Sequence, residues 1–376
     1  MTGGRSLRVA FYAPMKPPDD PRPSGDRTVA RLFWQALTLS GHRPVLASRL
    51  VSRDPQGDEG RQRRLAVLGE RMARRSLRRE PRPDLWFTYH NYYKAPDWIG
   101  PRVADALGIP YVVAEASLAP KRAHGAWAFN YRGVVQGLAR ADAIIPYNRA
   151  NEGCLPHPER HRTLRPFLDP APFRRAGTDP AAARTALAAR WGLDPGQPWI
   201  LVCAMMRRGD KLASYRLLAE ALNRLPPRPW LMLVAGDGPA AEEVQSLFGA
   251  LPPDRIRWLG RLDPAELPGF YAAGDLLAWP AVREAFGMSL LEAQAAGLPV
   301  VAGAELGVPA VVADGETGLL VAPRDTAALA SAIDRLLQDE GLRRRLGRAA
   351  AACVLRRHSL AAAAKRLDEI LQEVTP

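Results

Sequence analysis

Apolar and polar positions follow a repeating order of short apolar runs and longer amphipathic stretches. The first half contains five runs typical of buried strands, LRVAFYA, PVLAS, LWFTYH, PYVVAEA and AIIPY. Amphipathic stretches near residues 26–40, 61–79, 97–107 and 123–140 predict helices among them. Buried strands that alternate with helices are typical of parallel sheets covered by helices.

The second half repeats this order, with strand candidates WILVCAM, LMLVAG, IRWLG, LLAWP and PVVAG. A single sheet of about ten strands would be unusual, so we expect two Rossmann-like α/β domains. Pro, Gly and charged residues interrupt the periodicity over residues 166–180. The predicted domains are therefore 1–170 and 171–355, followed by a helix within 356–376.

Composition is that of a globular protein, with 47% hydrophobic and 24% charged residues in a chain of 376. The net charge of +13 is unusual, and only five of the 52 basic residues are Lys. This Arg excess has two explanations that stay open. It either follows from a GC-rich genome or was selected for function, and in both cases it creates a positive field that attracts nucleotide-sugars, lipid phosphates or anionic membranes.

Cysteine usage and the N-terminal sequence bear on the compartment. Cys154, Cys203 and Cys353 form no CxxC motif, and we expect reduced thiols that serve as small core residues in a cytoplasmic protein. The first residues contain no apolar run long enough for a signal peptide or a membrane span. Any membrane contact is therefore expected to be peripheral, on the inner face.

The segment EAFGMSLLEAQAAGLPVVA, residues 284–302, carries the clearest candidate site. Its pattern predicts a loop, a helix, a turn and a strand. Gly287 permits close approach of the backbone to a ligand, and the free N–H groups at a helix start favour phosphate. The N–H groups that open this predicted helix belong to Met288, Ser289 and Leu290.

Two carboxylates flank this predicted phosphate site. Glu284 and Glu292 would repel phosphate, so we expect them to accept hydrogen bonds from neutral hydroxyl groups. A nucleotide-sugar, with a diphosphate between two polyols, meets both requirements. The alternative is a helix that carries two solvated glutamates.

Together with GVPAVVADGETGLLVAPRD, residues 307–325, this segment resembles the E-x7-E signature of the family 4 retaining glycosyltransferases. The resemblance implies the GT-B fold, in which two Rossmann-like domains with parallel sheets face each other across a cleft. It places the acceptor on the N-terminal domain and the nucleotide-sugar on the C-terminal domain, and makes the last helix cross back. It assigns the donor sugar to Glu284 and the ribose hydroxyls to Glu292.

A second anion site is predicted where WILVCAM ends, in the loop that holds Arg207, Arg208 and Lys211. The family has an R-L-x-x-x-K-G loop there, whose Arg and Lys hold the diphosphate. Here Arg207 precedes Lys211 by four residues and Leu212 replaces the Gly. The resemblance therefore assigns the binding of the diphosphate to Lys211 and Arg207. Arg208 is the alternative to Arg207. Solvated loop charges are the other explanation.

These cations also bear on metal use. The chain contains no D-x-D pair, the usual metal-binding motif of nucleotide-sugar enzymes. We expect Lys, Arg and helix N–H groups to stabilise the leaving diphosphate instead. The protein is therefore predicted to need neither a metal nor another cofactor.

The remaining donor-side candidates follow from the resemblance. Gly236, Asp237 and Gly238 lie in AGDGP, which is similar to the G-x-G-P element on the nucleotide side. The base is expected near Arg261 and Leu262, without a preference for uracil or guanine. Phe286 lies within the E-x7-E segment.

Acceptor-side candidates lie in the N-terminal half: Ser24, Gly25, Asp26, His90, Glu115 and His124. The family's Gly-Gly loop corresponds to the first three, although Asp26 acting only as a helix cap is an equal alternative. His90 ends a predicted strand, where a structural role is the other explanation. In the family a histidine contacts the donor sugar. Glu115 and His124 are the two candidates for its role here, and the sequence does not decide between them.

The resemblance implies a hexosyltransferase-type glycosyltransferase that moves a sugar from a UDP- or GDP-sugar to a saccharide, lipid-linked saccharide or glycolipid, as in cell-envelope polysaccharide biosynthesis. The alternatives are a nucleotide-sugar epimerase and a non-catalytic basic protein that binds nucleic acid or membranes. No nucleic-acid partner is expected, because the chain has no zinc knuckle or RNP sequence. The basic stretch 61–80 either contacts an anionic membrane or packs on its own domain.

Overall fold

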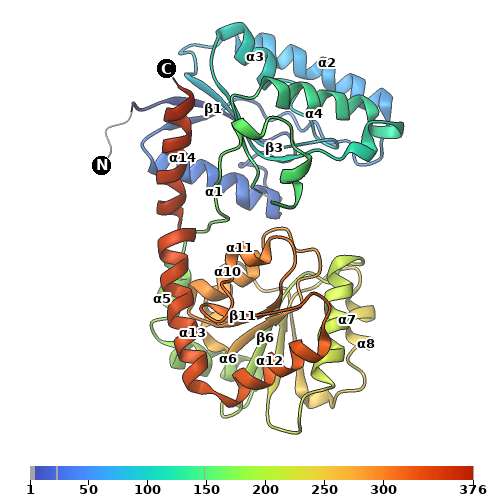
Figure 1. The fold of residues 1–376 in the computed structure, drawn as a ribbon, viewed down its shortest axis with the longest axis vertical. Coiled ribbons are helices and arrows are strands. Elements are labelled where there is room, and N and C mark those ends of the chain that lie inside the picture. The colour runs from blue at the N-terminus through green and yellow to red at the C-terminus, as the bar shows by residue number, and fades with distance from the viewer. Residues whose placement is uncertain (1–4, 23, 148, 376) are drawn as a thin grey trace. The chain divides into compact units, whose positions relative to one another are not determined.

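The computed structural model describes residues 5–22, 24–147 and 149–375, with only the backbone of 149–151. The chain forms two compact units. Unit 1 comprises Met1–Arg165 and Leu360–Pro376, and unit 2 comprises Pro166–Ser359. Each unit contains one sheet with helices packed around it (Figure 1). The prediction of two α/β domains, each with its own sheet, is confirmed.

Unit 1 has a 5-stranded parallel sheet in the order β2-β1-β3-β4-β5. Its strands are short and apolar, as the periodicity predicted. They are β1 (Arg8–Tyr12), β2 (Arg43–Leu46), β3 (Leu85–Tyr92), β4 (Tyr111–Ser117) and β5 (Ala143–Ile145). The longer helices are α1 (Gly25–Leu39), α2 (Glu59–Ser76), α3 (Gly100–Leu107), α4 (Ala128–Arg140) and α14 (Leu360–Val374).

Two groups of helices cover this sheet. Helices α2, α3 and α4 pack against one another, and α14 packs along α1 on the opposite side (Figure 1). The stripe of α14 that faces inward is fully apolar, with Leu367, Ile370 and Leu371 completely buried. Buried aliphatic side chains of this kind supply most of the free energy that holds a helix on its domain.

Unit 2 has a 6-stranded parallel sheet in the order β11-β10-β9-β6-β7-β8. Its strands are β6 (Trp199–Cys203), β7 (Leu231–Ala235), β8 (Ile256–Gly260), β9 (Leu276–Trp279), β10 (Val300–Gly303) and β11 (Gly318–Val321). The periodicity predicted all of these except β11. That strand has only four residues and begins with Gly, so its sequence carries little strand signal.

The helices of unit 2 also form two groups. Helix α7 packs with α8 and α12, whereas α9 packs with α5, α6 and α10. The bounds are α5 (Ala171–Ala176), α6 (Pro180–Trp191), α7 (Asp210–Leu222), α8 (Ala241–Ser246), α9 (Leu267–Ala273), α10 (Met288–Ala295), α11 (Val308–Val311), α12 (Thr326–Gln338) and α13 (Glu340–Cys353).

The two passages of the chain between the units are tied to each other. The Leu168 N–H donates to the His358 carbonyl over 3.0 Å, and the His358 ring nitrogen Nδ1 lies 2.7 Å from the Pro166 carbonyl oxygen. The units therefore divide at Arg165 and at Ser359, whereas the periodicity placed the divisions at 170 and 355. Pairing between distant segments leaves no trace in local periodicity.

Each sheet has one point where the strand order reverses. In unit 1 it lies between β1 and β3, and in unit 2 it lies between β6 and β9. In open parallel sheets, ligands bind outside the carboxyl ends of the strands at such a switch point. The loops that follow these four strands are therefore the places to look for a site.

Candidate functional site

The loops after β6, β7 and β8 are joined to one another by backbone hydrogen bonds. The Ala204 N–H donates to the Ala235 carbonyl over 3.1 Å, and the Met206 N–H donates to the Asp237 carbonyl over 3.0 Å. The Gly236 N–H donates to the Gly260 carbonyl over 2.8 Å. This ladder brings the predicted loop of Arg207, the AGDGP turn and the start of the Arg261 loop to one edge of the sheet.

Two glycines make this close approach feasible. A Cβ atom on Gly236 would lie 1.9 Å from the Ala204 carbonyl oxygen, and one on Gly238 would lie 2.3 Å from that of Met206. No side chain fits at either distance. The structural role of these glycines is thus to let neighbouring loops pack tightly, while the predicted contact with a nucleotide stays a prediction.

Lys211 and Glu284 meet at the switch point of unit 2. Lys211 lies in the first turn of α7, after β6, and Glu284 lies in the loop after β9. The Lys211 ammonium donates to Glu284 Oε2 over 2.5 Å and lies 5.4 Å from the centre of the Trp279 ring. Both side chains stay partly accessible, at 33% and 19%. Two residues predicted for different roles thus form one ion pair at the carboxyl ends of the strands.

The loop that carries Glu284 is held in an uncommon backbone conformation. Ala281 and Arg283 have φ values of 58° and 49°, in the left-handed region that residues other than Gly rarely adopt. The loop is fixed from two sides, because the Val282 N–H donates to Ser214 Oγ over 3.0 Å and the Gly307 N–H donates to the Glu284 carbonyl over 3.0 Å. The position of the Glu284 carboxylate is therefore set by the surrounding packing.

Helix α10 begins directly after this loop. Its cap residue Gly287 has φ 65° and ψ 42° and no side chain to close the helix end. Leu290 is fully buried, whereas Met288 and Ser289 are half-buried. The predicted helix start is thus correct, and the open N–H groups of its first turn can donate hydrogen bonds to an anion.

Glu292 lies one turn further along α10, where its side chain and that of Cys203 are half-buried beside the fully buried Tyr271. The Tyr271 hydroxyl donates to Glu292 Oε2 over 2.9 Å. Burial, and secondarily the Glu292 charge, raise the pKa of the Cys203 thiol to about 12. Burial raises the pKa of Glu292 to about 7, against the opposing effect of the Tyr271 hydrogen bond. Glu292 therefore lies in a poorly hydrated place that suits a neutral hydroxyl partner better than an ion.

The raised pKa of Glu292 makes the stability of the protein depend on pH. In the unfolded chain this carboxyl group has a pKa near 4.5, so between pH 4.5 and about 7 the folded protein binds the extra proton. The free energy of unfolding should therefore fall as pH rises through this window. The substitution Glu292→Gln should remove that fall, so its melting temperature should exceed the wild-type value at pH 8 and approach it at pH 4.5. Parallel melting-temperature profiles for the two proteins would contradict the prediction.

The two candidate arginines differ in their surroundings. Arg208 is directed toward α8, with its Nε 3.4 Å from Glu243 Oε2. The Arg207 side chain is exposed and makes no hydrogen bond or ion pair within the described residues. Arg207 is thus the cation of the two that remains available to a ligand.

In unit 1, Asp26 and His90 meet at the switch point. Asp26 lies in the first turn of α1, after β1, and His90 lies in β3. Asp26 Oδ1 is 2.8 Å from His90 Nδ1. Burial acts to raise the pKa of Asp26, but the hydrogen bond and charge of His90 outweigh it and hold this pKa below its usual value. The alternative that Asp26 acts only as the cap of α1 is excluded. Ser24 is the cap, since its Oγ accepts from the Arg27 N–H over 3.2 Å.

Glu115 lies on β4, the strand next to β3, and is buried at 4% exposure. Its φ of 58° and the φ of 65° at His90 place both residues in the left-handed region. Left-handed φ values at residues other than Gly cost free energy, and backbone strain of this kind is concentrated at functional sites. His124 is exposed and precedes the short helical turn Gly125–Trp127. Between the two candidates, Glu115 is the one on the strand next to His90.

Several residues of these sites were not predicted. Tyr271 contacts Glu292, Trp279 contacts Lys211, and Ser214 holds the loop of Glu284 through its hydrogen bond with Val282. Each comes from an apolar run or helix typical of ordinary core. Gly307 opens the motif 307–325 but was not predicted to have a role of its own, although a Cβ there would lie 1.9 Å from the Ala285 carbonyl oxygen. The expectation that all three thiols lie in the core was also wrong, because Cys154 is exposed.

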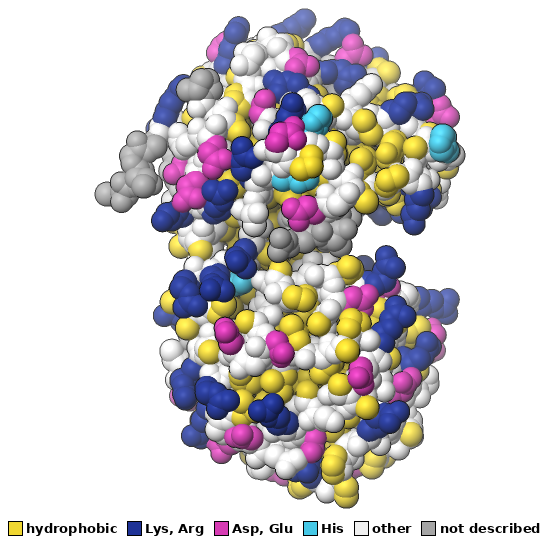
Figure 2. All heavy atoms as spheres, viewed as in Figure 1, with side chains coloured by type: hydrophobic (Ala, Val, Ile, Leu, Met, Phe, Trp, Pro, Cys, Tyr) yellow, Lys and Arg dark blue, Asp and Glu magenta, His cyan; other side chains and the backbone are white. Residues whose placement is uncertain are grey.

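The described residues lack the features of a metal site and of a membrane-spanning helix. They contain no group of three or more His, Cys, Asp or Glu side chains arranged to hold a metal ion. No helix in the described ranges combines the length and apolar character needed to cross a membrane. Figure 2 shows Lys and Arg scattered over the visible face of both units and interspersed with Asp and Glu.

Comparison with known proteins gives consistent matches. Residues 191–352 match the family model described as glycosyl transferases group 1. The chain is 34% identical over 289 residues to the D-inositol 3-phosphate glycosyltransferase of Frankia alni, covering 70% of this chain and 69% of that protein. It is 42% identical over 163 residues to the protein of the same name from Corynebacterium efficiens, covering 42% of this chain and only 38% of that relative.

Solved structures extend the similarity to nearly the whole chain. The crystal structure of Anabaena Alr3699/HepE in complex with UDP superposes with a TM-score of 0.75. The match covers 97% of this chain and 100% of the other, at 17% sequence identity. At this identity the similarity concerns the fold.

Proposed function

Since the chain belongs to the group 1 glycosyl transferases, we propose that it transfers a sugar from a nucleotide-sugar to a hydroxyl group of an acceptor. The expected membership of family 4 and the GT-B architecture of two Rossmann-like domains are confirmed. The matched regions span only 38% and 56% of the first two curated relatives. The activity, donor and acceptor described below are therefore the proposal.

The ion pair between Lys211 and Glu284 carries this proposal. It lies where the strand order of unit 2 reverses, and the open N-terminus of α10 follows Glu284 directly. A diphosphate needs the cation and the helix N–H groups, whereas a sugar needs the carboxylate. The proximity of these features in one place suits a nucleotide-sugar better than either part alone. Arg207, Gly236 to Gly238, Arg261, Leu262 and Phe286 complete the proposed donor site.

In the proposed reaction, the bond between the anomeric carbon and the diphosphate oxygen breaks, and negative charge grows on the departing diphosphate. Lys211, Arg207 and the N–H groups of α10 stabilise this charge. Glu284 orients the sugar through its hydroxyls, and Glu292 accepts a hydrogen bond from a ribose hydroxyl. The acceptor oxygen forms the new bond on the face that the diphosphate leaves, and its proton passes to the diphosphate. The anomeric configuration is thereby retained.

For the acceptor side we propose the residues at the switch point of unit 1. Asp26, His90 and Glu115 combine a hydrogen-bonded acid–base pair with a buried carboxylate, which suits the binding of a polyol. The curated relatives named above are D-inositol 3-phosphate glycosyltransferases. We therefore include small phosphorylated polyols among the acceptors, beside saccharides and lipid-linked saccharides.

Thermal unfolding with a panel of UDP, GDP, ADP and their sugars tests the donor site. A ligand at about 100 times its Kd should add about 2.7 kcal/mol to the free energy of unfolding. Glu292→Ala should weaken binding of the nucleotide and of its sugar alike, because both contain ribose. Glu284→Ala should weaken only the nucleotide-sugar. Loss of a hydrogen bond to a charged group should cost about 1.5–3 kcal/mol of binding free energy.

The exposed Glu242 at the start of α8 provides a matched control, since Glu242→Ala removes one carboxylate outside the proposed contacts. Unchanged binding of every nucleotide-sugar in the Glu284→Ala, Glu292→Ala double variant would refute the donor assignment.

Transfer should proceed at an undiminished rate in excess EDTA. The reason is that Lys211, Arg207 and the α10 N–H groups supply the positive charge that a divalent ion provides in other nucleotide-sugar enzymes. Initial rates with EDTA, Mg²⁺ or Mn²⁺ measure this directly. An absolute requirement for either metal would overturn the prediction.

Transfer is favoured over epimerisation and over non-catalytic binding. The curated relatives named above are glycosyltransferases, and basic side chains are scattered over the visible surface in place of one basic face (Figure 2). Peripheral contact with an anionic membrane through α2 remains part of the proposal. Its support is the exposure of Val67 at 49% and Leu68 at 39% on a helix rich in Arg.

A further inference from the structure

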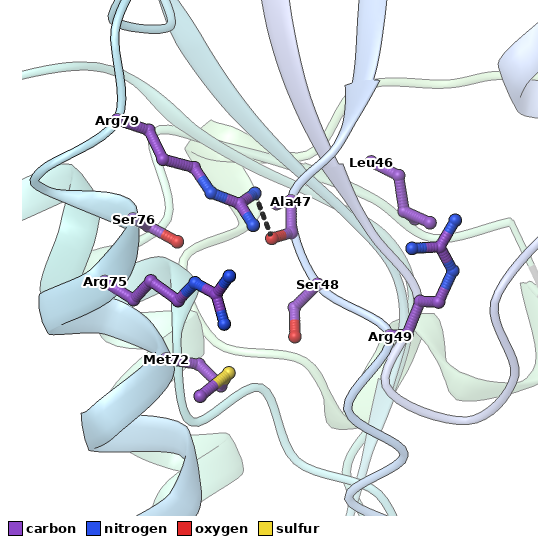
Figure 3. A pocket seen from close by; sticks show the side chains of 8 residues that line it. All are labelled: Leu46, Ala47, Ser48, Arg49, Met72, Arg75, Ser76 and Arg79. Carbon is purple, nitrogen blue, oxygen red and sulfur yellow. Dashed lines mark hydrogen bonds between the residues drawn. The ribbon is translucent and has the colours of Figure 1, made fainter.

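A cavity of about 220 Å³ lies in unit 1 between the carboxyl end of β2 and the end of α2 (Figure 3). Strand β2 is the edge of the sheet, one strand removed from the β1–β3 switch point. Neither Asp26 nor His90 lines the cavity. It is lined by Leu46, Ala47, Ser48, Arg49, Met72, Arg75, Ser76 and Arg79.

The charges around this cavity are not balanced within the protein. Figure 3 shows Arg75 and Arg79 reaching from the end of α2 and the following turn toward Ala47 and Ser48. Arg79 donates to the Ala47 carbonyl oxygen over 3.1 Å. Within the described ranges, the Arg75 side chain makes no hydrogen bond or ion pair, and no acid pairs with Arg79. Arg49, by contrast, has a carboxylate partner, with its guanidinium 2.6 Å from Asp19.

Neutral donors and apolar walls complete the cavity. Ser48 Oγ accepts from the Leu50 N–H over 3.1 Å, which leaves its own O–H to donate. Ser76 provides a second hydroxyl, and Met72 and Leu46 form apolar walls. A water molecule occupies about 30 Å³ in the liquid, so the volume holds a group of several heavy atoms.

We propose that this cavity binds a phosphate group of a ligand. Guanidinium groups present paired N–H donors that match phosphate oxygens, and two of them with two hydroxyls can satisfy several oxygens at once. A bound phosphate would also remove the repulsion between Arg75 and Arg79. The proposal is independent of the proposed transfer reaction, because it concerns the binding of phosphate by residues that have no part in the proposed donor or acceptor site.

The phosphate can belong to a soluble phosphate ester or to a lipid headgroup. The chemistry in the cavity is the same for both sources. They differ in what surrounds the phosphate, because a lipid would also bring the exposed Val67 and Leu68 of α2 to the bilayer. Inorganic phosphate and phosphatidylglycerol vesicles are therefore the two probes.

The experiment compares the wild-type protein with two double variants. Arg75→Ala with Arg79→Ala removes both unbalanced charges at the cavity. Arg61→Ala with Arg64→Ala removes the same charge from the other end of α2, where both side chains are exposed. Calorimetry with inorganic phosphate at fixed ionic strength should give a Kd at least about tenfold higher for the cavity variant. The control should stay within about twofold of the wild type.

A third variant keeps both arginines. Ser76→Asp places a carboxylate at the cavity and should abolish phosphate binding while the melting temperature of the protein is retained. The proposal is overturned if the wild type binds no phosphate, if the cavity variant binds like the wild type, or if the control loses as much affinity. None of these measurements uses a nucleotide-sugar, so a failure here is distinct from a failure of the donor assignment.

Sedimentation with phosphatidylglycerol vesicles then identifies the source. If the cavity variant sediments less than the control, and inorganic phosphate releases the wild type, the ligand is a lipid headgroup. If the variants sediment alike while the cavity variant has lost phosphate binding, the ligand is a soluble phosphate ester.

Discussion

Replacement of Lys211 by alanine should lower kcat for sugar transfer about 100- to 1000-fold, the usual loss when one preorganised donor to a developing oxyanion is removed. The effect should fall mainly on kcat, since negative charge on the diphosphate is greatest as its bond to the sugar breaks. The same change leaves Glu284 without its partner at 2.5 Å, so binding of the sugar should weaken as well. Single-turnover rates and nucleotide affinities of purified variants measure the two contributions.

Arg208→Ala is the matched control for this substitution. It removes a cation three positions away, but one that is 85% exposed and directed toward Glu243. Its kcat should stay within a few-fold of the wild-type value, whereas Arg207→Ala should behave like a milder form of Lys211→Ala. Equal losses for Lys211→Ala and Arg208→Ala would show that general positive charge, and not the placement of Lys211, assists the reaction.

Gly307→Ala should lower kcat about 100-fold or more without touching a ligand. A Cβ at this position would lie 1.9 Å from the Ala285 carbonyl oxygen, so the loop that carries Glu284 must move. Displacement of a substrate-orienting group by about 1 Å can cost about 100-fold in rate. The hydrogen bond from the Gly307 N–H to the Glu284 carbonyl would be lost in the same movement. Steady-state kinetics and thermal unfolding test the two parts together.

Gly269→Ala is the corresponding control, because nothing lies within 4 Å of a Cβ there and the residue is helical. Alanine is the better helix former, so this variant should keep its rate and gain stability. A Gly307→Ala protein that folds normally and keeps the wild-type kcat would show that the Glu284 loop is not the orienting element proposed here.

The fold was predictable because its signals are local. Each strand of the two sheets except β11 is a short apolar run, and the helices between them have amphipathic periods, so Trp199–Cys203 and Asp210–Leu222 could be recognised from sequence alone. The positions of the unit boundaries were not predictable to the residue. They depend on hydrogen bonds between Pro166–Leu168 and His358, which join residues that are distant in sequence.

The candidate site was predictable only in its polar members. Glu284, Glu292 and Lys211 stand out because they interrupt apolar patterns, and their proximity follows from the order of parallel strands. The residues that hold them do not stand out. Tyr271, which donates to Glu292, lies inside the apolar helix LPGFYAA. The two residues are 21 positions apart in the sequence, so no local pattern links them. Such partners become visible only when the tertiary structure is known.

The helix Leu360–Val374 has a consequence for biosynthesis. Ribosomes make unit 1 up to Arg165, then all of unit 2, and only afterwards the segment that packs along α1. Until then the nascent unit 1 exposes the apolar surface of α1 that Leu367 and Ile370 later cover, and the His42 ring lacks Asp368, its partner at 3.3 Å. The first-made half of the protein therefore reaches its final form last, and a chaperone that shields apolar surface has a defined interval of translation in which to act.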